Sequence, residues 1–471
     1  MAFQKPSIPK GTRDFTPPEM VRRNYIFDII RKIFQVFGYQ PIETPAMENL
    51  ATLMGKYGVE GDKLLFKILN SGNFLEGFQK SNIEHRTSNI EHRTSNIESE
   101  NPDYKELTPL IAEKGLRYDL TVPFARFVVQ HQNELTFPFK RYQIQPVWRA
   151  DRPQKGRYRE FFQCDVDVIG SNSLLNEIEL AQIIDEVFSQ LGMNILIRIN
   201  NRKILAGVAE ILGYPSKLTD ITVAIDKLEK TSIEKVSEEL LYKGISTEAI
   251  ERLRPLIRLE GKIKEKIDFL SEFLNTSEIG LKGIEELLVI KNHLKDLDLK
   301  NRFDFDFRLA RGLTYYTGTI IEVKAIDVPI GSVCGGGRYD DLTGIFGLTG
   351  VSGVGISFGA DRIYDVMNAL KLFPDNLEST TKLLFLNFGG EEEKFSLQLL
   401  AHCRKSGIAS EIYPQNIKLN KQLEYANRKN IPYVVFIGND EMATGELKVK
   451  DMKTGVQQSM VVEDLKNFLL L

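Results

Sequence analysis

Residues 147–170, VWRADRPQKGRYREFFQCDVDVIG, place several cations beside aromatic side chains and end in two carboxylates. The charged residues in question are Arg149, Arg152, Lys155, Arg157 and Arg159, followed by Asp165 and Asp167. Guanidinium groups match phosphate oxygens, aromatic rings stack on flat bases, and carboxylates accept hydrogen bonds from an ammonium group. This sequence of residue types favours a ligand that has phosphate, purine and amine parts.

We interpret the stretch as an antiparallel hairpin, with KRYQIQPVWRA and REFFQCDVDVIG as its arms and DRPQKGRYR as its loop. Side chains alternate between the two faces of a strand. One face is then polar and carries Gln143, Gln145 and Arg149 on the first arm and Phe161, Gln163, Asp165 and Asp167 on the second. Arg149 on this face and Arg157 on the loop suit phosphate, Phe161 suits a base, and Gln163 and Asp167 suit an amine. The alternative is a hairpin with a solvated basic tip.

A second candidate segment is GLRYDLTVPFARFVVQH. We expect a strand that ends at Thr121, which is a good N-cap, and a helix with Pro123 in its first turn. In a regular strand Arg117, Asp119 and Thr121 share one face, so that Asp119 and Thr121 would reach an amine. A capping threonine beside a surface aspartate explains the same residues equally well.

The segment FDFDFRLARGLTYYTGTIIEV predicts an alternating strand, a turn at Arg311 and Gly312, and a second strand. A guanidinium next to a glycine can approach an anion closely, although a solvated turn arginine fits the same pattern. Tyr315 and Tyr316 point to opposite faces of a regular strand. Only one of them therefore lines the pocket wall, unless the strand bulges.

Two glycine clusters complete the candidate site. GGGRYDDL, from Gly335, lacks the GxxxxGK[ST] pattern of a phosphate-binding P-loop, but it allows the backbone to approach a ligand. SGVGISFGADRI predicts a strand and then a helix that begins near Ala360, with Arg362 where a nucleotide would lie across small residues. A bare glycine-rich turn is the alternative for both clusters.

The bulk composition limits the class of protein. The 471 residues are 42% hydrophobic, which predicts a soluble protein of two to four domains. We expect neither a membrane span nor a signal peptide, and therefore a cytoplasmic location. Three distant cysteines argue against a disulfide framework and a zinc site. With a net charge of -3, local basic patches must hold any nucleic acid, and five histidines make histidine-centred catalysis unexpected.

The elements that must position the candidate residues follow from periodicity. A helix is expected from about Val21 to Phe37, closed by Gly38, and a strand follows through YQPIETP. Residues 81–98 repeat the heptapeptide SNIEHRT, which has one apolar residue where a coiled coil needs two, so we expect a solvated insertion without chemistry. Residues 201–300 have helical spacing, and residues 381–471 alternate strands with helices, which predicts a small α/β domain.

Together these residues resemble the histidine-tRNA ligase family of class II aminoacyl-tRNA synthetases. The resemblance includes KGTRDFTP, the motif 1 region FGYQPIETPAMENL with Pro45, motif 2 at residues 147–170 and motif 3 in GVGISFGADRI. LARGLTYYTG and GGGRYDDL resemble the two histidine-specific signatures. The implied fold is an α+β catalytic domain built on an antiparallel sheet, with a helical insertion and a C-terminal α/β anticodon-binding domain. The implied bounds are 1–200 and 301–372 for the catalytic core, with the repeat insertion at about 70–110, 201–300 for the helical insertion, and 381–471 for the anticodon-binding domain.

The resemblance also implies a role for each candidate residue. Arg149 and Arg311 are the catalytic residues that meet charge at the α-phosphate. ATP binding is assigned to Arg149, Arg157, Phe161, Arg311 and Arg362. Histidine binding is assigned to Asp119, Thr121, Gln163, Asp167, Tyr315 and Tyr316. No metal ligand is assigned to the protein, and Mg²⁺ is expected to arrive with ATP.

The implied reaction has two steps. The histidine carboxylate attacks the α-phosphorus of ATP and gives histidyl-adenylate, and a ribose hydroxyl of tRNA(His) then takes the acyl group. No protein nucleophile is needed, and we expect no editing domain because a site that hydrogen-bonds imidazole rejects apolar competitors. The expected partners are histidine, ATP, tRNA(His) and a second copy of the chain, joined through the motif 1 region. Residues 418–429 have four cations against Glu424, which suits phosphate contacts, although a solvated helix face is the alternative.

The sequence departs from the family pattern at three places. Asp119 stands where some members have glutamate, Thr314 replaces a commonly acidic residue, and the repeat has no counterpart. Two other functions stay open, namely a non-catalytic paralogue that senses histidine, such as the synthetase-like subunit of ATP phosphoribosyltransferase, and an RNA-binding sensor module. Such paralogues usually lack the C-terminal domain and lose the active-site arginines, which this chain retains at Arg149, Arg311 and Arg362.

The first prediction concerns Arg311. We expect Arg311→Ala to abolish histidine-dependent exchange between pyrophosphate and ATP, a loss of about 100-fold or more, because a cation that meets transition-state charge is removed. Exchange measured with purified protein, Mg²⁺ and histidine checks this, and circular dichroism should show an unchanged fold. Normal activity of the variant would contradict the role given to Arg311.

Overall fold

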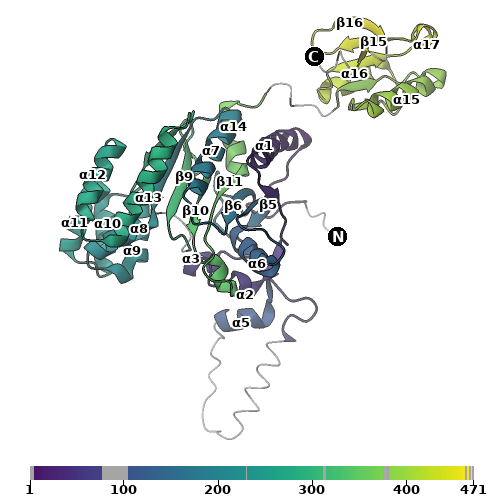
Figure 1. Ribbon diagram of the computed structural model, residues 1–471. Helices are drawn as coiled ribbons and strands as arrows, with labels where there is room; N and C mark the ends of the chain where they lie inside the picture. The colour runs from purple at the N-terminus through teal and green to yellow at the C-terminus, as the bar shows by residue number, and fades with distance from the viewer. Residues whose placement is uncertain are drawn as a thin grey trace. The chain divides into compact units, whose positions relative to one another are not determined.

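The computed structural model describes residues 5–76, 104–229, 231–310, 315–374, 377, 381–461, 464–465 and 468 (Figure 1). The chain divides into two compact units, Met1–Asp14 with Ile26–Leu372 and Phe15–Tyr25 with Phe373–Leu471. Each unit has its own sheet. Among the helices of the described residues, none combines the length and the apolar character that crossing a membrane requires.

The first unit is built on a sheet of eight strands. All neighbouring strands are antiparallel except at the two edges, where β1 pairs with β5 and β8 pairs with β7 in parallel. The predicted sheet is therefore confirmed, with parallel edges that the sequence did not indicate. The strands lie in the order β1 (Gln40–Pro41), β5 (Phe139–Trp148), β6 (Glu160–Ile169), β11 (Gly353–Gly359), β10 (Cys334–Tyr339), β9 (Thr319–Ala325), β7 (Ile195–Asn201) and β8 (Arg302–Phe305).

Helices cover the apolar face of this sheet. Phe358 of β11 lies 5.8 Å from the ring of Phe34 and 5.7 Å from that of Phe188, between ring centroids. Burial of each such side chain stabilises the fold by about 1.5–3 kcal/mol. The predicted first helix begins earlier than expected and ends as expected before Gly38, which has a positive φ. The covering helices are α1 (Pro17–Val36), α7 (Leu175–Gln190) and α14 (Ala360–Leu370).

The predicted hairpin is confirmed. β5 and β6 pair in antiparallel register from Phe139 opposite Ile169 to Trp148 opposite Glu160, so the loop comprises residues 149–159. The amide of Arg159 donates a hydrogen bond to the carbonyl of Gly11, which fastens the loop to the N-terminal segment. The hairpin thus supplies the second and third strands of the eight-stranded sheet.

The segment before the hairpin differs from its prediction. The strand ends at Leu116 instead of Thr121, and the next helix begins at Thr121 with Leu120 as its N-cap residue. Because leucine cannot cap, Asp119 accepts the hydrogen bond from the amide of Val122 at 3.1 Å instead. The prediction that Thr121 caps the helix was therefore wrong.

The common face predicted for Arg117, Asp119 and Thr121 is also wrong. Arg117 is buried and donates to the carbonyls of Thr44 at 2.6 Å and Pro146 at 2.9 Å, whereas Asp119 has other partners. Residues 117–120 form irregular chain, which breaks the strand parity. The smaller elements of this region are β2 (Met47–Asn49), α2 (Leu50–Leu53), α3 (Gly58–Lys63), β3 (Lys67–Ile68), α5 (Tyr104–Ile111), β4 (Lys114–Leu116), α6 (Thr121–His131) and η3 (Leu342–Phe346).

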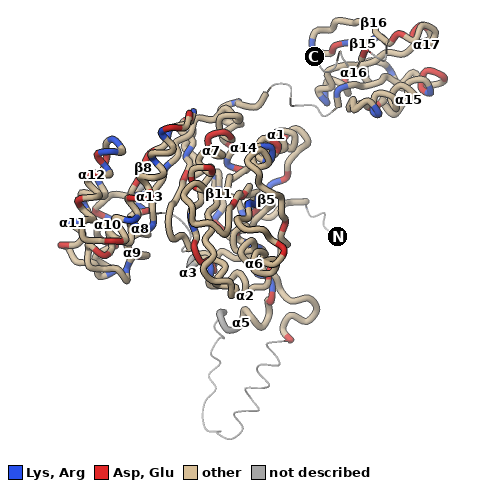
Figure 2. Tube along the Cα trace, viewed as in Figure 1, with Lys and Arg blue, Asp and Glu red and all other residues tan. Residues whose placement is uncertain are grey.

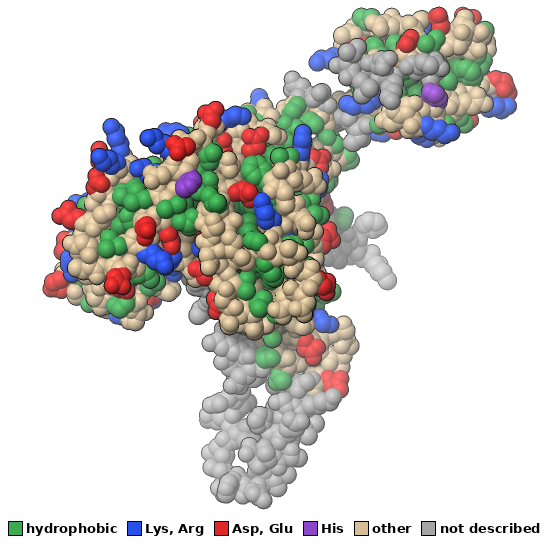
Figure 3. Space-filling model, in the orientation of Figure 1, with side chains coloured by type: hydrophobic (Ala, Val, Ile, Leu, Met, Phe, Trp, Pro, Cys, Tyr) green, Lys and Arg blue, Asp and Glu red, His purple; other side chains and the backbone are tan. Residues whose placement is uncertain are grey.

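Helices fill the chain between β7 and β8, as the spacing of residues 201–300 predicts. Figure 2 shows basic and acidic residues interspersed along these helices, and Figure 3 shows charged and apolar side chains together on their surface. Lys266 joins the helices to the sheet, because its Nζ lies 2.8 Å from Asp304 Oδ2 and 2.9 Å from the carbonyl of Phe305. The helices are α8 (Arg202–Ile211), η1 (Pro215–Lys217), α9 (Leu218–Asp226), η2 (Lys227–Glu229), α10 (Ile233–Tyr242), α11 (Thr247–Ile257), α12 (Ile263–Phe273) and α13 (Glu278–Lys295).

The second unit contains the predicted alternation of strands and helices. β12 pairs in parallel with β13 and β14, and an antiparallel hairpin of β15 and β16, which we did not predict, extends the sheet. The elements are β12 (Leu383–Phe385), α15 (Gly390–Lys405), β13 (Ser410–Ile412), α16 (Leu419–Arg428), β14 (Tyr433–Phe436), α17 (Asn439–Thr444), β15 (Glu446–Asp451) and β16 (Gln457–Val461). The predicted domain boundaries stay predictions, and the repeat at 81–98 lies outside the described residues.

Candidate active site

The polar face of the large sheet carries the candidate site. The register places Arg141, Asp167, Gly355 and Gly337 side by side in one row across β5, β6, β11 and β10. Because directly paired residues point to the same side, these four share the polar face. The neighbouring row consists of Gln143, Asp165, Ser357, Gly335, Glu322 and Arg198.

A cavity of about 480 Å³ lies on this face. Its wall includes six of the predicted site residues, which are Arg149, Arg157, Phe161, Gln163, Tyr316 and Arg362. Four further predicted residues, Asp119, Thr121, Asp167 and Tyr315, do not line the cavity. The structure therefore brings Arg149, Arg157, Arg362 and the stacking aromatic together, and it buries Asp119 and Asp167 of the expected amine-binding residues.

Arg149 is oriented by its surroundings. Its Nε donates a hydrogen bond to the carbonyl of Tyr118 at 3.0 Å, and its Cζ lies 4.2 Å from the centre of the Tyr118 ring and 5.3 Å from that of Phe161. Each such cation–π contact is worth about 0.5–2 kcal/mol. The guanidinium group is thus fixed in the cavity wall before any ligand arrives.

The other two cations differ in how firmly they are held. The side chain of Arg157 is 39% exposed and its Nη1 lies 3.6 Å from Asp151 Oδ1, so it can move to meet a ligand. Arg362, in the first turn of α14, donates to the carbonyls of Gly156 and Ser332, both at 2.7 Å. Arg362 therefore ties the hairpin loop to the chain before β10 and at the same time lines the cavity.

Asp119 is almost completely buried and is surrounded by donors. Its Oδ1 accepts hydrogen bonds from the Tyr57 hydroxyl and the Val122 amide, both at 3.1 Å, and its Oδ2 lies 3.4 Å from the Tyr315 hydroxyl. Burial raises the pKa of Asp119, and these donors and the field of Arg149 lower it. A nearby ammonium group would favour the ionised form further.

Asp167 is held from two sides. The Tyr339 hydroxyl donates a hydrogen bond to Asp167 Oδ1 at 2.7 Å, and Arg141 Nη2 lies 2.8 Å from Asp167 Oδ2. A Cβ atom added at Gly355 would come within 1.9 Å of Asp167 Oδ1, so the strand beside Asp167 must have a glycine there. Burial raises the pKa of the Asp167 carboxyl, whereas Arg141 lowers it.

The two tyrosines lie before β9 in irregular chain, where the parity of a strand does not apply. Their rings meet edge to face with centroids 5.0 Å apart. Tyr315 reaches Asp119, whereas Tyr316 lines the cavity and experiences the fields of Asp119, Asp165 and Asp167, which raise its pKa together with burial. Tyr316 therefore lies between the cavity and the buried carboxylates.

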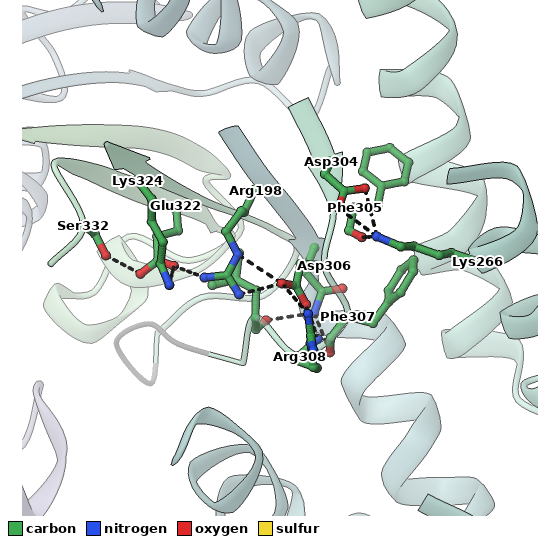
Figure 4. Close-up of polar contacts among 12 residues, drawn as sticks. Arg198, Lys266, Asp304, Phe305, Asp306, Phe307, Arg308, Glu322, Lys324 and Ser332 are labelled. Carbon is green, nitrogen blue, oxygen red and sulfur yellow. Dashed lines mark hydrogen bonds and ion pairs between the residues drawn. The ribbon is translucent and has the colours of Figure 1, made fainter. Parts of the chain in front are cut away.

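Arg198 of β7 lies between two carboxylates on the same face (Figure 4). Its Nη2 is 2.6 Å from Asp306 Oδ2, and its Nη1 is 2.6 Å from Glu322 Oε2. Burial raises the pKa of Asp306, but the guanidinium groups of Arg198 and Arg308 outweigh this and hold the pKa at about 2. The network joins the cavity wall at Glu322 to the chain that follows β8.

Several site residues escaped the sequence analysis. Glu322 and Ser332 line the cavity and are hydrogen-bonded to each other. Arg13 pairs with Asp361 and Asp365 and so braces the start of α14. The alternation in TIIEV was the available signal for Glu322, because it places Glu322 on the same face of the strand as Ile320, which also lines the cavity. No comparable signal singled out Arg13.

Two residues of the prediction cannot be placed. Arg311 and Thr314 lie outside the described residues, so the expected role of Arg311 at the α-phosphate stays a prediction. Within the part of the chain that the structure describes, no group of three or more histidine, cysteine and acidic side chains has the arrangement of a metal site.

The sheet and the polar cavity on its face are those of the catalytic domain of a class II aminoacyl-tRNA synthetase. The family model of histidyl-tRNA synthetase matches residues 91–363, and the model of the anticodon binding domain matches residues 384–470. The chain therefore belongs to the histidyl-tRNA synthetase family.

Relatives and solved structures agree with this assignment. The histidine–tRNA ligase of Bacteroides fragilis is 57% identical over 98% of both chains, and that of Porphyromonas gingivalis is 57% identical over 97% of both chains. The crystal structure of histidyl-tRNA synthetase from Nostoc sp. PCC 7120 has a TM-score of 0.80 and 30% identity over 99% of both chains.

A fourth comparison concerns the alternative functions. A structure described as an ATP phosphoribosyltransferase regulatory subunit/histidyl-tRNA synthetase, from Bacillus halodurans, has a TM-score of 0.68 at 18% identity and covers 93% of this chain and 98% of that chain. At this identity the likeness concerns the fold alone. The fold is thus compatible with both kinds of protein, and the identity to the ligases decides the family.

The second prediction concerns the glycine beside Asp167. Gly355→Ala should lower the free energy of unfolding by about 1–3 kcal/mol, because the new methyl group overlaps a buried carboxylate that has no room to move. Gly359→Ala, in the same strand, is the matched control, because its Cβ would lie 3.6 Å from the nearest atom. Denaturant unfolding of both variants provides the measurement, and equal stability of the two would contradict the explanation.

Proposed function

We propose that the chain attaches L-histidine to tRNA(His) in an ATP-dependent reaction that passes through histidyl-adenylate and releases AMP and pyrophosphate. The observation that carries this proposal is the convergence of oriented guanidinium groups and buried carboxylates on one face of the sheet, beside one cavity. The names of the relatives that are 57% identical over nearly the whole chain support it.

The cationic end of the cavity suits ATP. Arg149, fixed by Tyr118, would contact the α-phosphate and the carboxylate of the amino acid, and the exposed Arg157 would follow the outer phosphates. The ring of Phe161 offers a stacking surface for the purine. Arg362 would complete the nucleotide site from α14, although its hydrogen bonds to two carbonyls give it a structural role as well.

The acidic end suits histidine. Asp119 and Asp167 supply negative charge for the ammonium group, and Gln163 and Thr121 supply further hydrogen bonds. A neutral imidazole has one donor and one acceptor nitrogen, so a carboxylate and a tyrosine hydroxyl, such as that of Tyr316, can satisfy both. Because the site is built from hydrogen-bonding groups, an apolar competitor would leave buried polar atoms without partners.

The proposed chemistry needs positioning rather than a protein nucleophile. A carboxylate oxygen of histidine attacks the α-phosphorus, and the bond to the pyrophosphate oxygen breaks. Arg149 and Arg311 would stabilise the charge that develops on the phosphoryl oxygens. A terminal ribose hydroxyl of the tRNA then attacks the acyl carbon, and AMP leaves. Mg²⁺ would neutralise phosphate charge, and Glu322 and Asp151 are oxygen donors in the cavity wall of the type it prefers.

The second unit would bind the tRNA through α16. Lys418, Lys421, Arg428 and Lys429 are exposed there. Arg428 pairs with Glu424 at 2.7 Å, and Lys429 pairs with Glu411 at 2.9 Å, but exposed pairs of this kind are worth little and can open for phosphate. We further propose a homodimer joined through the motif 1 region and a cytoplasmic location, both of which rest on the family resemblance.

The third prediction tests the reaction itself. Purified protein with Mg²⁺ should exchange labelled pyrophosphate into ATP only when histidine is present, because adenylate formation is reversible and specific. The measurement is the exchange rate with each of the twenty amino acids in turn. Absence of histidine-dependent exchange would favour a sensor that keeps the fold without the chemistry.

The fourth prediction concerns Phe161. Phe161→Leu should raise the KM for ATP by about 5- to 100-fold, because stacking on a base is worth about 1–3 kcal/mol. The KM for histidine should change by less than about threefold, since leucine leaves Gln163, Asp165 and Asp167 further along β6 unchanged. Steady-state exchange kinetics with each substrate varied separately measure both constants, and an equal rise in the two would argue against stacking.

A further inference from the structure

Several buried polar atoms of β5 and β6 have no hydrogen-bond partner within the part of the chain that the structure describes. They are Nε and Nη2 of Arg141, Oδ1 of Asp165, Oδ2 of Asp167 and Oε1 of Gln163. All four residues lie on the polar face of the sheet, with Arg141 directly opposite Asp167. Buried polar atoms are almost always satisfied in proteins, so a group of them indicates a place that a polar ligand or water completes.

The charges of this group do not balance. Arg141 is completely buried, and its Nη2 lies 2.8 Å from Asp167 Oδ2 and 3.9 Å from Asp165 Oδ2. The shorter contact is close but lacks the alignment of a hydrogen bond, so it acts chiefly through charge. One guanidinium group thus serves two carboxyl groups. Burial raises the pKa of Asp165 to about 7, although the field of Arg141 lowers it.

Among the residues that the structure describes, the other groups that face Asp167 do not supply the missing positive charge. Asp119, from the turn before α6, adds a further buried carboxylate to its surroundings. Tyr339 of β10, Tyr316 before β9 and Tyr39 before β1 contribute only hydroxyl groups, and burial raises the pKa of each. A ligand with a positive charge would restore the balance.

Arg141 acts from outside the cavity. Neither Arg141 nor Asp167 lines the cavity, but Asp167 belongs to β6, which contributes Phe161 and Gln163 to the wall, whereas no residue of β5 lines it. The Cζ of Arg141 packs 4.2 Å from the centre of the Phe124 ring of α6. With Tyr339 on one oxygen of Asp167 and Arg141 on the other, the carboxylate has one fixed orientation. The absence of a side chain at Gly355 gives that orientation its space.

We propose that Arg141 is a positioning residue for the amino-acid substrate, which holds the Asp167 carboxyl in place together with Tyr339 and so directs its negative charge to the ammonium group. This inference rests on the proposed role of Asp167 in histidine binding. Arg141 itself does not touch the substrate. Its effect therefore passes through Asp167, and it should concern histidine but not ATP.

The test is Arg141→Met, which keeps an extended buried side chain without its charge. The KM for histidine in the exchange reaction should rise about 10- to 100-fold. This is the loss expected when the hydrogen bond between Asp167 and the ammonium group of histidine is weakened, because Asp167 is no longer held by a cation. The KM for ATP should stay within about threefold of the wild type. Calorimetric binding of histidine alone should weaken by the same factor as the KM.

The pH dependence separates this role from general destabilisation. Loss of Arg141 removes a cation that lowers the pKa of Asp167, so that pKa rises and a larger fraction of Asp167 is protonated at a given pH. Burial raises the pKa of Asp165 to about 7, so Asp165 would titrate between pH 6.5 and pH 8.5, and the comparison is made in an Asp165→Asn background. In that background the rise in KM for histidine should be larger at pH 6.5 than at pH 8.5. A variant that is only less stable would show the same ratio of constants at both values.

Two further variants control for structure. Arg338→Met breaks a buried ion pair with Glu177, of 2.6 Å, on the opposite face of the same sheet, and it should lower stability without a selective change in the KM for histidine. Arg141→Lys, which keeps the charge, should raise that KM by less than the methionine variant does, and it is the test if Arg141→Met does not fold. An unchanged KM in the lysine and methionine variants would overturn the proposal.

A double-mutant cycle with Asp167→Asn completes the experiment. If Arg141 acts through Asp167, adding Arg141→Met to Asp167→Asn should change the histidine KM by less than about threefold, since contacting residues are not additive. Full additivity, or equal rises in the constants for histidine and ATP, would refute the role of Arg141. Absence of exchange in the wild type would instead contradict the proposed function, and calorimetry would still show whether Arg141 affects histidine binding.

Discussion

A carboxylate that leaves water must find donors or cations to replace its hydration, and this requirement shapes the centre of the molecule. Asp119, Asp165 and Asp167 are each about 2% exposed. The groups that surround them come from separate parts of the chain, including the turn before α6, strands β5, β6 and β10, and the segment before β9. These segments must converge for the acids to be tolerated, so the acidic end of the cavity is also a convergence point of the fold.

One face of the sheet stabilises the fold, and the other face carries the candidate active site. On one face, Phe162, Cys164 and Phe358 are packed under helices whose burial supplies the hydrophobic stabilisation. On the other face, guanidinium groups and carboxylates occupy successive positions of the same strands. A rigid, well-covered apolar face allows the polar face to hold unsatisfied atoms and unbalanced charge, which cost free energy in the absence of ligand.

Much of the site could be predicted because alternation along a strand is a robust signal. It sorted Phe161, Gln163 and Asp167 onto one face, and the register confirms the hairpin that carries them. Arg141 was missed although it has the same parity as Gln143, because a cation near the start of a strand reads as a solvated residue. Burial at the middle of a sheet depends on neighbours that are distant in sequence.

The errors have a common physical cause. The prediction for Thr121 assumed a continuous strand, whereas irregular chain from Arg117 to Leu120 turns Asp119 inward as the capping residue. The tyrosine pair was likewise treated as part of a strand that begins only at Thr319. Strand propensity depends on the local sequence alone. Here the hydroxyl groups of Tyr57 and Tyr315, which are distant in sequence, contact Asp119 and outweigh that local preference.

The glycine at position 355 also has an evolutionary implication. The carboxylate of Asp167, on the neighbouring strand, fills the space that a side chain at position 355 would occupy. The length of the acid at position 167 and the lack of a side chain at position 355 therefore depend on each other. A lineage that exchanged aspartate for a longer acid would need to shift the carboxylate and the arginine opposite it in concert. Substitutions at positions 141, 167 and 355 should therefore be correlated among relatives. The amino-acid pocket should change by rare simultaneous substitutions rather than by single ones.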